Sequence, residues 1–292
     1  MIRILSFLII FLCSSFAYSK EKIELIVPYG AGGGFDLLAR RISNAIDESV
    51  LKVDVINKTG GASNIALSYF IGQQKALLLT GNPIIENERY ASDGYPKNVT
   101  KVAKPIYFIG EGPQILFTSL PVNSIDEMIL LSQTKDIVFG ANSPGTGSYD
   151  IYDHLCNILK VFKNCNLVTY RSSSFAIPDL LAGRINAYGN TYGAYNAFVS
   201  SGKAKAILVL DKKRFYALPE IVSLKEKGFD YDLTTWFGLF HVGLTDQQVS
   251  LIKKSIDALM TDEEYKKHGY DKIEENPISF FNSQIQQFSN KK

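Results

Sequence analysis

The chain has 292 residues, of which 46% are hydrophobic and 21% are charged, a composition that is ordinary for a globular protein with an apolar core. Its formal net charge at pH 7 is only +2, and the sequence contains no long basic run. Because nucleic-acid-binding proteins normally present a clustered basic surface, this charge pattern argues against a nucleic-acid partner. The length allows one large domain or two modest ones.

The N-terminal segment has the pattern of a secretory signal peptide. Arg3 supplies a positive charge, residues 4–16 are almost wholly apolar, and small residues place the expected cleavage near Ser19. The apolar run is shorter than the ~20 residues that a membrane-spanning helix needs. A lipoprotein signal that uses Cys13 is the alternative, although Leu12 is not the small residue that usually precedes a lipid-modified cysteine. We therefore expect export and a soluble mature chain.

Strands and helices are expected to alternate in the first half of the mature chain. The expected strands are residues 23–27, 53–56 and 76–79, and the expected helices are residues 37–42 and 65–70. Asp36 and Asn64 are placed to cap these two helices. This βαβαβ order predicts a parallel sheet with helices on both faces.

A second unit with the same rhythm is expected to begin near Leu120, after two extended pieces at residues 106–109 and 115–118 that flank a Gly-Glu-Gly-Pro segment. A return strand is expected near the C-terminus, and late helices of this kind often pack back onto the first unit. We therefore expect a signal peptide at 1–19, domain 1 at 20–118 plus 225–292, and domain 2 at 119–224. The expected helices of the second half are 124–132, 149–159, 176–181, 246–260 and 277–288, and its strands are 136–140, 167–170, 185–188, 206–209 and 235–242.

A glycine-rich loop, Gly-Ala-Gly-Gly-Gly at residues 30–34, follows the first strand and precedes the first helix. Glycines let backbone amides approach a ligand, and the helix N-terminus adds partial positive charge, so the loop predicts an anion site. It lacks both the spacing of a dinucleotide fingerprint and the Gly-Lys-Ser/Thr of a P-loop. A tight turn without a ligand is the alternative.

The second half offers a matching loop, Asn-Ser-Pro-Gly-Thr-Gly-Ser at residues 142–148, again after a strand and before a helix. Because ligands of open α/β sheets bind beyond the carboxyl ends of the strands, we expect the two loops to face each other across a cleft. Two unrelated turns are the alternative.

Cys156 and Cys165 form an even pair in an exported chain, so a disulfide is the expected state and two buried thiols are the alternative. Groups suited to catalysis are sparse. His154, His241 and His268 are expected to be surface or structural residues, no serine lies in a Gly-x-Ser-x-Gly segment, and no histidine–carboxylate spacing suggests a metal site. We expect neither an enzyme, nor a metal, nor a cofactor.

As a set, these residues resemble the Bug family, which comprises the TctC-type extracytoplasmic solute receptors of tripartite tricarboxylate transporters. The resemblance runs in order along nearly the whole mature chain. The matching segments are residues 26–40, 57–65, 143–148, 170, 178–183, 201–203, 217–221 and 236–240.

The resemblance implies an α/β fold of the type II periplasmic binding-protein class, in which two α/β domains close on a ligand like a flytrap. It also implies a periplasmic location, a small carboxylate ligand held by the two loops, and membrane transporter subunits as partners. We expect a monomer. A ligand-binding component of a membrane signalling receptor, or a periplasmic enzyme that uses the same cleft, are the alternatives.

Three departures from the family pattern bear on the ligand. Lys58-Thr59 replaces a common Arg-Pro, and Phe35 stands where a polar residue is common, which narrows the pocket or adds apolar contact. Asn190 stands where an aspartate is frequent, so a plain carboxylate is favoured over an acidic amino acid. For Asp36, capping of its helix is an alternative to ligand contact. The candidate ligand-binding residues are Tyr29, Gly32, Gly33, Phe35, Asp36, Asn64, Asn82, Ser143, Thr146, Gly147, Ser148, Tyr170 and Asn190.

Overall fold

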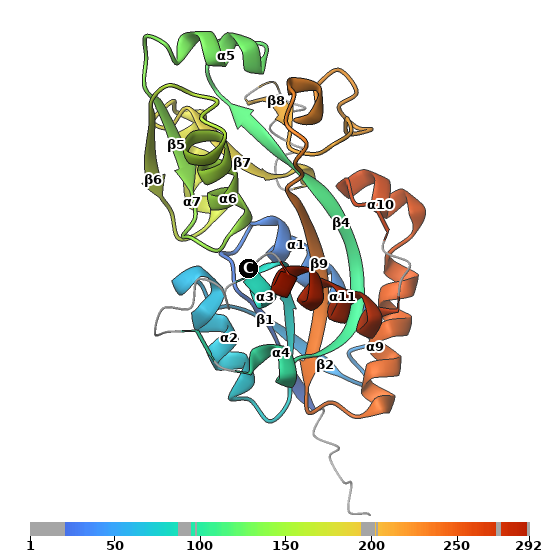
Figure 1. The fold of residues 1–292 in the computed structure, drawn as a ribbon. Coiled ribbons are helices and arrows are strands. Elements are labelled where there is room, and N and C mark those ends of the chain that lie inside the picture. Colours follow the sequence, from blue (N-terminus) through green and yellow to red (C-terminus); the bar gives the residue numbers. More distant parts are fainter. Residues whose placement is uncertain are drawn as a thin grey trace, which may run out of the picture.

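The computed structural model describes residues 21–86, 95–96, 98–193, 202, 204–272 and 276–290. They form two α/β lobes, one above the other in Figure 1, joined by two long neighbouring strands. The expected signal peptide, residues 1–19, lies outside the described residues. Among the helices that the structure describes, none is both long and apolar enough to cross a membrane.

The sheet of the first lobe has the strand order β2-β1-β3-β9-β4. Three strands, β1 (Lys22–Val27), β2 (Lys52–Asn57) and β3 (Ala76–Thr80), are parallel, as the sequence predicts. The return strand β9 (Thr234–Val242) runs antiparallel to β3, and β4 (Lys104–Thr118) runs antiparallel to β9, so the sheet is mixed. The parallel arrangement predicted for the βαβαβ unit is confirmed, and the expected return strand adds the antiparallel part when the chain re-enters this lobe from the other one.

Both faces of this sheet are buried, which explains the nearly continuous apolar runs in its strands. Leu25 and Leu77 pack on one face with α1 (Gly34–Ala45) and α9 (Asp246–Leu259), whereas Ile26 and Leu78 pack on the other face with α2 (Asn64–Ile71) and α11 (Pro277–Asn290). Among the described residues, the remaining short helices of this lobe are η1 (Gly61–Ser63), α3 (Pro83–Glu86), α4 (Val99–Val102) and α10 (Asp262–His268), and the sequence patterns predicted none of the four.

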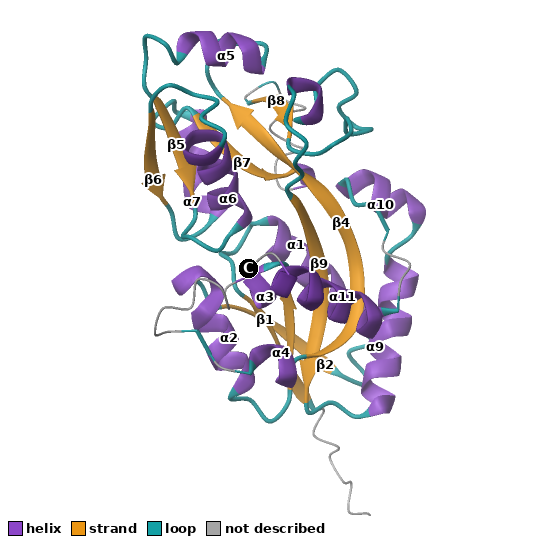
Figure 2. Cartoon of the chain, in the orientation of Figure 1, coloured by secondary structure: helices purple, strands orange, loops and turns teal. Residues whose placement is uncertain are grey.

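The second lobe repeats this plan on a smaller scale (Figure 2). In it, β5 (Ile137–Ala141) pairs in parallel with both β6 (Cys165–Thr169) and β7 (Ala187–Thr191), while β8 (Lys205–Val209) pairs with the end of β4. Its helices are α5 (Ile125–Leu131), α6 (Gly147–Tyr152), α7 (Ser173–Leu181) and η3 (Lys225–Lys227), and α6 continues directly as a π-helical segment η2 (Asp153–Ile158).

Strand β4 crosses both lobes without a break, which corrects the prediction of two short extended pieces. Its first part pairs with β9, and residues 114–118 pair with β7 and β8. The glycines between the two expected pieces lie within the strand and serve close packing. A Cβ on Gly110 would lie 2.8 Å from the carbonyl oxygen of Asp271, and one on Gly112 would lie 2.8 Å from that of Gly269.

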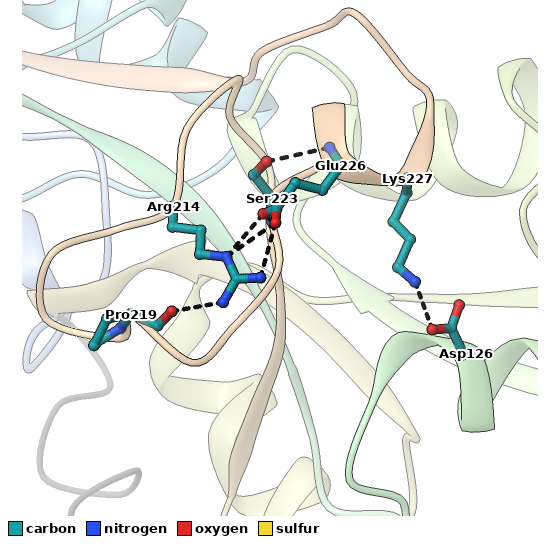
Figure 3. Close-up of polar contacts among 6 residues, drawn as sticks. All are labelled: Asp126, Arg214, Pro219, Ser223, Glu226 and Lys227. Carbon is teal, nitrogen blue, oxygen red and sulfur yellow. Dashed lines mark hydrogen bonds and ion pairs between the residues drawn. The ribbon is translucent and has the colours of Figure 1, made fainter.

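The connection that returns the chain from β8 to β9 is held by a cluster of polar contacts (Figure 3). The Arg214 guanidinium donates from Nη2 to Glu226 Oε1 at 2.8 Å and from Nη1 to the carbonyl oxygen of Pro219 at 2.8 Å. Glu226 also accepts from the backbone amide of Ser223 at 2.8 Å, and the hydrogen bond from Arg214 lowers the pKa of Glu226 to about 2. An ion pair between Lys227 and Asp126 ties the same segment to α5.

A disulfide joins Cys156, in η2, to Cys165, the first residue of β6, with their Cα atoms 6.0 Å apart. Strand β6 ends the strand order, pairs with β5 alone and is largely exposed. An edge strand with so few apolar contacts is open to local unfolding, so the disulfide fastens the least buried strand of the sheet to the lobe.

Replacing both Cys156 and Cys165 by alanine should lower the free energy of unfolding by about 2–3 kcal/mol, because the unfolded chain regains the freedom of a short closed loop. Urea denaturation with and without dithiothreitol measures the change. The reductant should destabilise the wild type by the same amount and leave the double variant unaffected. Equal midpoints for all four samples would contradict this role.

Candidate ligand-binding site

A cavity of about 50 Å³, called here the inner cavity, lies between the lobes and is bordered by both predicted loops. The described residues that line it are all uncharged, and many carry hydroxyl or amide groups. The first lobe contributes Tyr29, Gly33, Gly34, Phe35, Asn82 and Pro83, the second contributes Asn142, Thr146, Gly147, Ser148, Ser173, Asn190 and Thr191, and Gln114 and Thr235 belong to the crossing strands.

The inner cavity brings together most of the candidate residues chosen from the sequence. Those that line it are Tyr29, Gly33, Phe35, Asn82, Thr146, Gly147, Ser148 and Asn190. The other candidates, which do not line it, are Gly32, Asp36, Asn64, Ser143 and Tyr170. The hydroxyl of Tyr170 instead donates to the Asp179 carboxylate at 2.7 Å, within the second lobe.

Asp36 shapes the glycine loop instead of capping helix α1. Gly33, with extended backbone, occupies the N-cap position, and Asp36 is the third residue of the helix. Its buried carboxylate accepts hydrogen bonds from the Gly32 amide at 2.9 Å, from Arg40 Nε at 3.0 Å and from Asn57 Nδ2 at 2.9 Å. The prediction of an N-cap was wrong because the helix begins at Gly34, three residues earlier than expected, and the Asp36 carboxylate reaches back to the loop.

These contacts decide the charge of Asp36. Burial alone would raise the pKa of this carboxyl, but the hydrogen bonds from Arg40, Gly32 and Asn57 outweigh burial and lower it. The carboxylate is therefore ionised and fully engaged at neutral pH. It holds in place the loop that leads into α1, whose Gly33, Gly34 and Phe35 line the inner cavity.

Asn64 is the first residue of α2 and does not cap it, which corrects a second prediction. The N-cap position belongs to Ser63, whose φ of 77° is left-handed, and Ala62 before it has a φ of 50°. This tight turn leads straight into the helix, so no extended residue with a capping side chain precedes α2.

The second loop is organised by its own hydroxyl groups. Ser148 Oγ accepts from the Asn142 amide at 2.9 Å, and Thr146 Oγ1 donates to the carbonyl oxygen of Ser143 at 2.8 Å. Ser143 thus closes the turn and its side chain stays outside the cavity lining. The start of α6, at Gly147 and Ser148, is presented to the inner cavity.

The start of α7 completes the site and was not predicted from the sequence: Ser172 is the N-cap, and Ser173 and Ser174 are the first two helical residues. The amide of Gly30 donates to Ser172 Oγ at 3.2 Å, which is a direct hydrogen bond between the lobes. Ser173 Oγ accepts from Asn190 Nδ2 at 3.0 Å, so its own proton can be donated into the cavity that it lines. The sequence does carry a signal for this site, because the serine run follows a strand and opens the next helix.

Aromatic side chains border the inner cavity on the first-lobe side. The ring centroids of Tyr29 and Phe35 are 4.5 Å apart, and Phe237 lies 4.5 Å behind Phe35. Burial raises the pKa of the Tyr29 phenol, so the hydroxyl stays protonated. The Phe35 ring lines the inner cavity and takes up space on its first-lobe side.

A much larger outer cavity, of about 620 Å³, adjoins the inner one and shares Asn82, Gln114, Gly147 and Thr235 with it. Its lining is rich in carboxylates. Burial, with the nearby charges of Glu86 and Asp153, raises the pKa of Asp150 to about 8. Over the part of the chain that the structure describes, no three His, Cys, Asp or Glu side chains are grouped so as to hold a metal ion.

Comparison with known proteins identifies relatives of this architecture. A family model described as the tripartite tricarboxylate transporter family receptor matches residues 88–290. The protein BugT of Bordetella pertussis is 22% identical over 249 residues, which cover 82% of this chain and 76% of BugT.

Solved structures give the same result for the fold. The periplasmic binding protein BugD has a TM-score of 0.80 at 23% identity, over 94% of this chain and 97% of that chain. An R. palustris protein with adipate has a TM-score of 0.79 at 21% identity, over 94% and 96% of the two chains. MatC from Rhodopseudomonas palustris with bound malate has a TM-score of 0.79 at 17% identity, over 94% and 99%. The predicted two-domain periplasmic binding-protein fold is thereby confirmed.

Asp36→Ala should lower the free energy of unfolding by about 3 kcal/mol, because it leaves buried donors without their acceptor. The difference in free energy of unfolding between the variant and the wild type should become smaller as the pH falls below about 3.9, the ordinary pKa of aspartate. The reason is that the pKa of Asp36 is lowered in the folded protein, so that only the ionised carboxylate stabilises the fold. Urea denaturation measures both effects. Asp54→Ala, which removes the partner of the exposed Lys22, is the control and should change the midpoint little. An equal loss in the two variants would contradict the role of Asp36.

Asp150→Asn should stabilise the protein more at pH 8 than at pH 5, by about 4 kcal/mol. A carboxyl group whose pKa is higher in the folded than in the unfolded protein destabilises the fold, and this cost grows as the pH rises from the unfolded pKa to the folded pKa. For Asp150 this pH window runs from about 4 to about 8. Chemical denaturation at pH 5, 6, 7 and 8 tests the prediction. A stability difference that does not depend on pH would contradict it.

Proposed function

Because the chain belongs to the family of tripartite tricarboxylate transporter receptors, we propose that it captures a small carboxylate between its lobes and delivers it to a membrane transporter of that kind. The observation that carries the proposal is the inner cavity, which lies where two loops and two helix N-termini converge on an uncharged polar space. Amides at helix N-termini and neutral hydroxyls are suited to an anion. The adipate and malate of two structural neighbours support the same ligand class.

In this proposal the carboxylate is held by the first turns of α1 and α6 and by the hydroxyl of Ser173. Phe35 limits the length of ligand that fits on the first-lobe side. Asn190 donates to Ser173 and accepts from the Thr191 amide at 2.8 Å, so it offers the inner cavity no negative charge. We infer that the carbon next to the carboxylate bears no amino group.

Capture depends on closure of the lobes, in our proposal. The hydrogen bond from Gly30 to Ser172 belongs to the closed arrangement, and β4 and β9 form the hinge. Backbone pairing in β4 changes partner after Pro113, and β9 begins at Thr234. The domain bounds expected from the sequence, at 118/119 and 224/225, lie close to these crossings and stay a prediction.

The proposal extends to the place and mode of action. We propose a periplasmic monomer, exported by a signal peptide cleaved near Ser19, which binds its ligand without turnover and presents the closed form to membrane subunits of the transporter. The periplasmic origin of the neighbour BugD supports this location. In this proposal the membrane subunits bind the closed, ligand-bound form more tightly than the open, empty form, so that they interact mainly with receptor molecules that carry a ligand.

Calorimetry with a panel of mono-, di- and tricarboxylates tests the proposal, together with native mass spectrometry of the purified protein for a retained ligand. Gly30→Ala should weaken binding by about tenfold, because a Cβ there would lie 2.6 Å from Ser172 Oγ and hinder closure. Gly72→Ala, at the end of α2, is the matched control and should bind normally, since its Cβ would make only ordinary contacts. No heat with any carboxylate and no retained ligand would overturn the proposed function.

A further inference from the structure

The inner cavity has room for only part of a ligand. Its volume of about 50 Å³ corresponds to a few water-sized groups, since one water molecule requires ~10–15 Å³ of such space. A carboxylate and an adjoining carbon fill it. The rings of Tyr29 and Phe35 border it on one side, so the rest of a longer ligand extends past the shared wall, formed by Asn82, Gln114, Gly147 and Thr235, into the outer cavity.

The outer cavity is acidic directly beyond that wall. Asp150 lies one helical turn after Gly147 in α6, and Glu86 accepts from Asn82 Nδ2 at 3.1 Å. Asp153 lies near enough to raise the pKa of Asp150 further. A cation bound here would favour the ionised form of Asp150 and relieve the repulsion among these side chains, whereas a second carboxylate on the ligand would add to that repulsion.

The far end of the outer cavity carries the same sign of charge. Burial, followed by the charges of Asp271 and Asp211, raises the pKa of Glu111. Lys213 also lines this end, but its Nζ lies 3.5 Å from the Asp271 carboxylate, which offsets its charge. The whole space therefore favours a positively charged group.

Gln114 gives independent support for a hydrogen-bond donor at the shared wall. Its side chain is only 4% exposed, and its Nε2 donates to Thr235 Oγ1. Its carbonyl oxygen Oε1 is buried and has no hydrogen-bond partner among the described residues. An unsatisfied buried acceptor is costly, and an ammonium group offers three donors, enough for Gln114, Asp150 and Glu86 together.

We propose that the ligand is an amino carboxylate, with its carboxylate in the inner cavity and its cationic amine, several bonds away, in the outer cavity against Asp150, Glu86 and Gln114. This inference rests on the proposed function, because it assigns a ligand class to the same site. It agrees with Asn190, which leaves the inner cavity without a partner for an amine next to the carboxylate.

Calorimetry with three matched sets of compounds tests the inference. Each set keeps one carboxylate and the same methylene chain and changes only the far end to ammonium, methyl or carboxylate: 4-aminobutanoate, pentanoate and glutarate; 5-aminopentanoate, hexanoate and adipate; 6-aminohexanoate, heptanoate and pimelate. In at least one set the amino compound should bind at least about tenfold more tightly than both others, as expected for a charged hydrogen bond.

Variants assign the preference to its residues. Asp150→Asn should reduce the preference for the ammonium end at least about fivefold while the methyl-ended compound binds as before. Glu86→Gln should act in the same direction. Asp136→Asn, an exposed aspartate directly before β5, is the control and should keep the full preference. Circular dichroism and the thermal midpoint of each variant verify folding.

The outcomes separate the two proposals. If a dicarboxylate or alkanoate binds as tightly as the amino compound in every set, or if Asp150→Asn leaves the preference intact, the amino-carboxylate inference is overturned and the proposed receptor function stands. If the wild type binds none of these compounds but does bind other carboxylates, the inference fails in the same way. If it binds no carboxylate at all, the proposed function fails with it.

Discussion

The antiparallel pair of β4 and β9 is the constraint on which both lobes and the cleft depend. From Lys104 to Pro113 the two strands are paired, and at the crossing the backbone of Gln114 accepts from Leu210 at 2.9 Å and donates to Leu233 at 3.0 Å. The same two strands place the side chains of Gln114 and Thr235 in the cavity wall. A rotation about the crossing thus moves the loops of both lobes relative to groups that stay fixed at the pivot.

The contrast in charge between the two cavities is the main chemical feature of the site. The inner cavity offers neutral hydroxyls, amides and helix N-termini, which suit an anion whose hydration shell has been removed. The outer cavity gathers carboxylates whose pKa values are raised by burial and by one another. In our proposal, a ligand that satisfies both spaces carries its charges at opposite ends, and the spacing of those charges is then selected together with their sign.

Much of this architecture could be predicted from local sequence patterns. The alternation of strands and helices and the two loops at strand ends follow from hydrophobic periodicity and glycine chemistry, and most of the chosen loop residues do line one cavity. The continuity of β4 could not be predicted, because a Gly-Glu-Gly-Pro segment separates its two apolar runs, and those glycines are required only by the close approach of residues 269–271 in the fold. The start of α1 was misplaced because Asp36 stabilises the loop from inside the helix. The acidic cavity was invisible because its carboxylates come from distant segments that only the fold brings together.

The order of strands in the first lobe has a consequence for the way the chain folds. The cores of the second lobe draw only on residues 115–233, a continuous stretch, whereas β3 in the first lobe finds its neighbour β9 only after that stretch has passed. Contacts between residues so far apart in sequence form late, since a long loop must be closed before they are made. During synthesis the second lobe can therefore reach its native state first, while the first lobe keeps an open sheet edge until the last quarter of the chain has emerged.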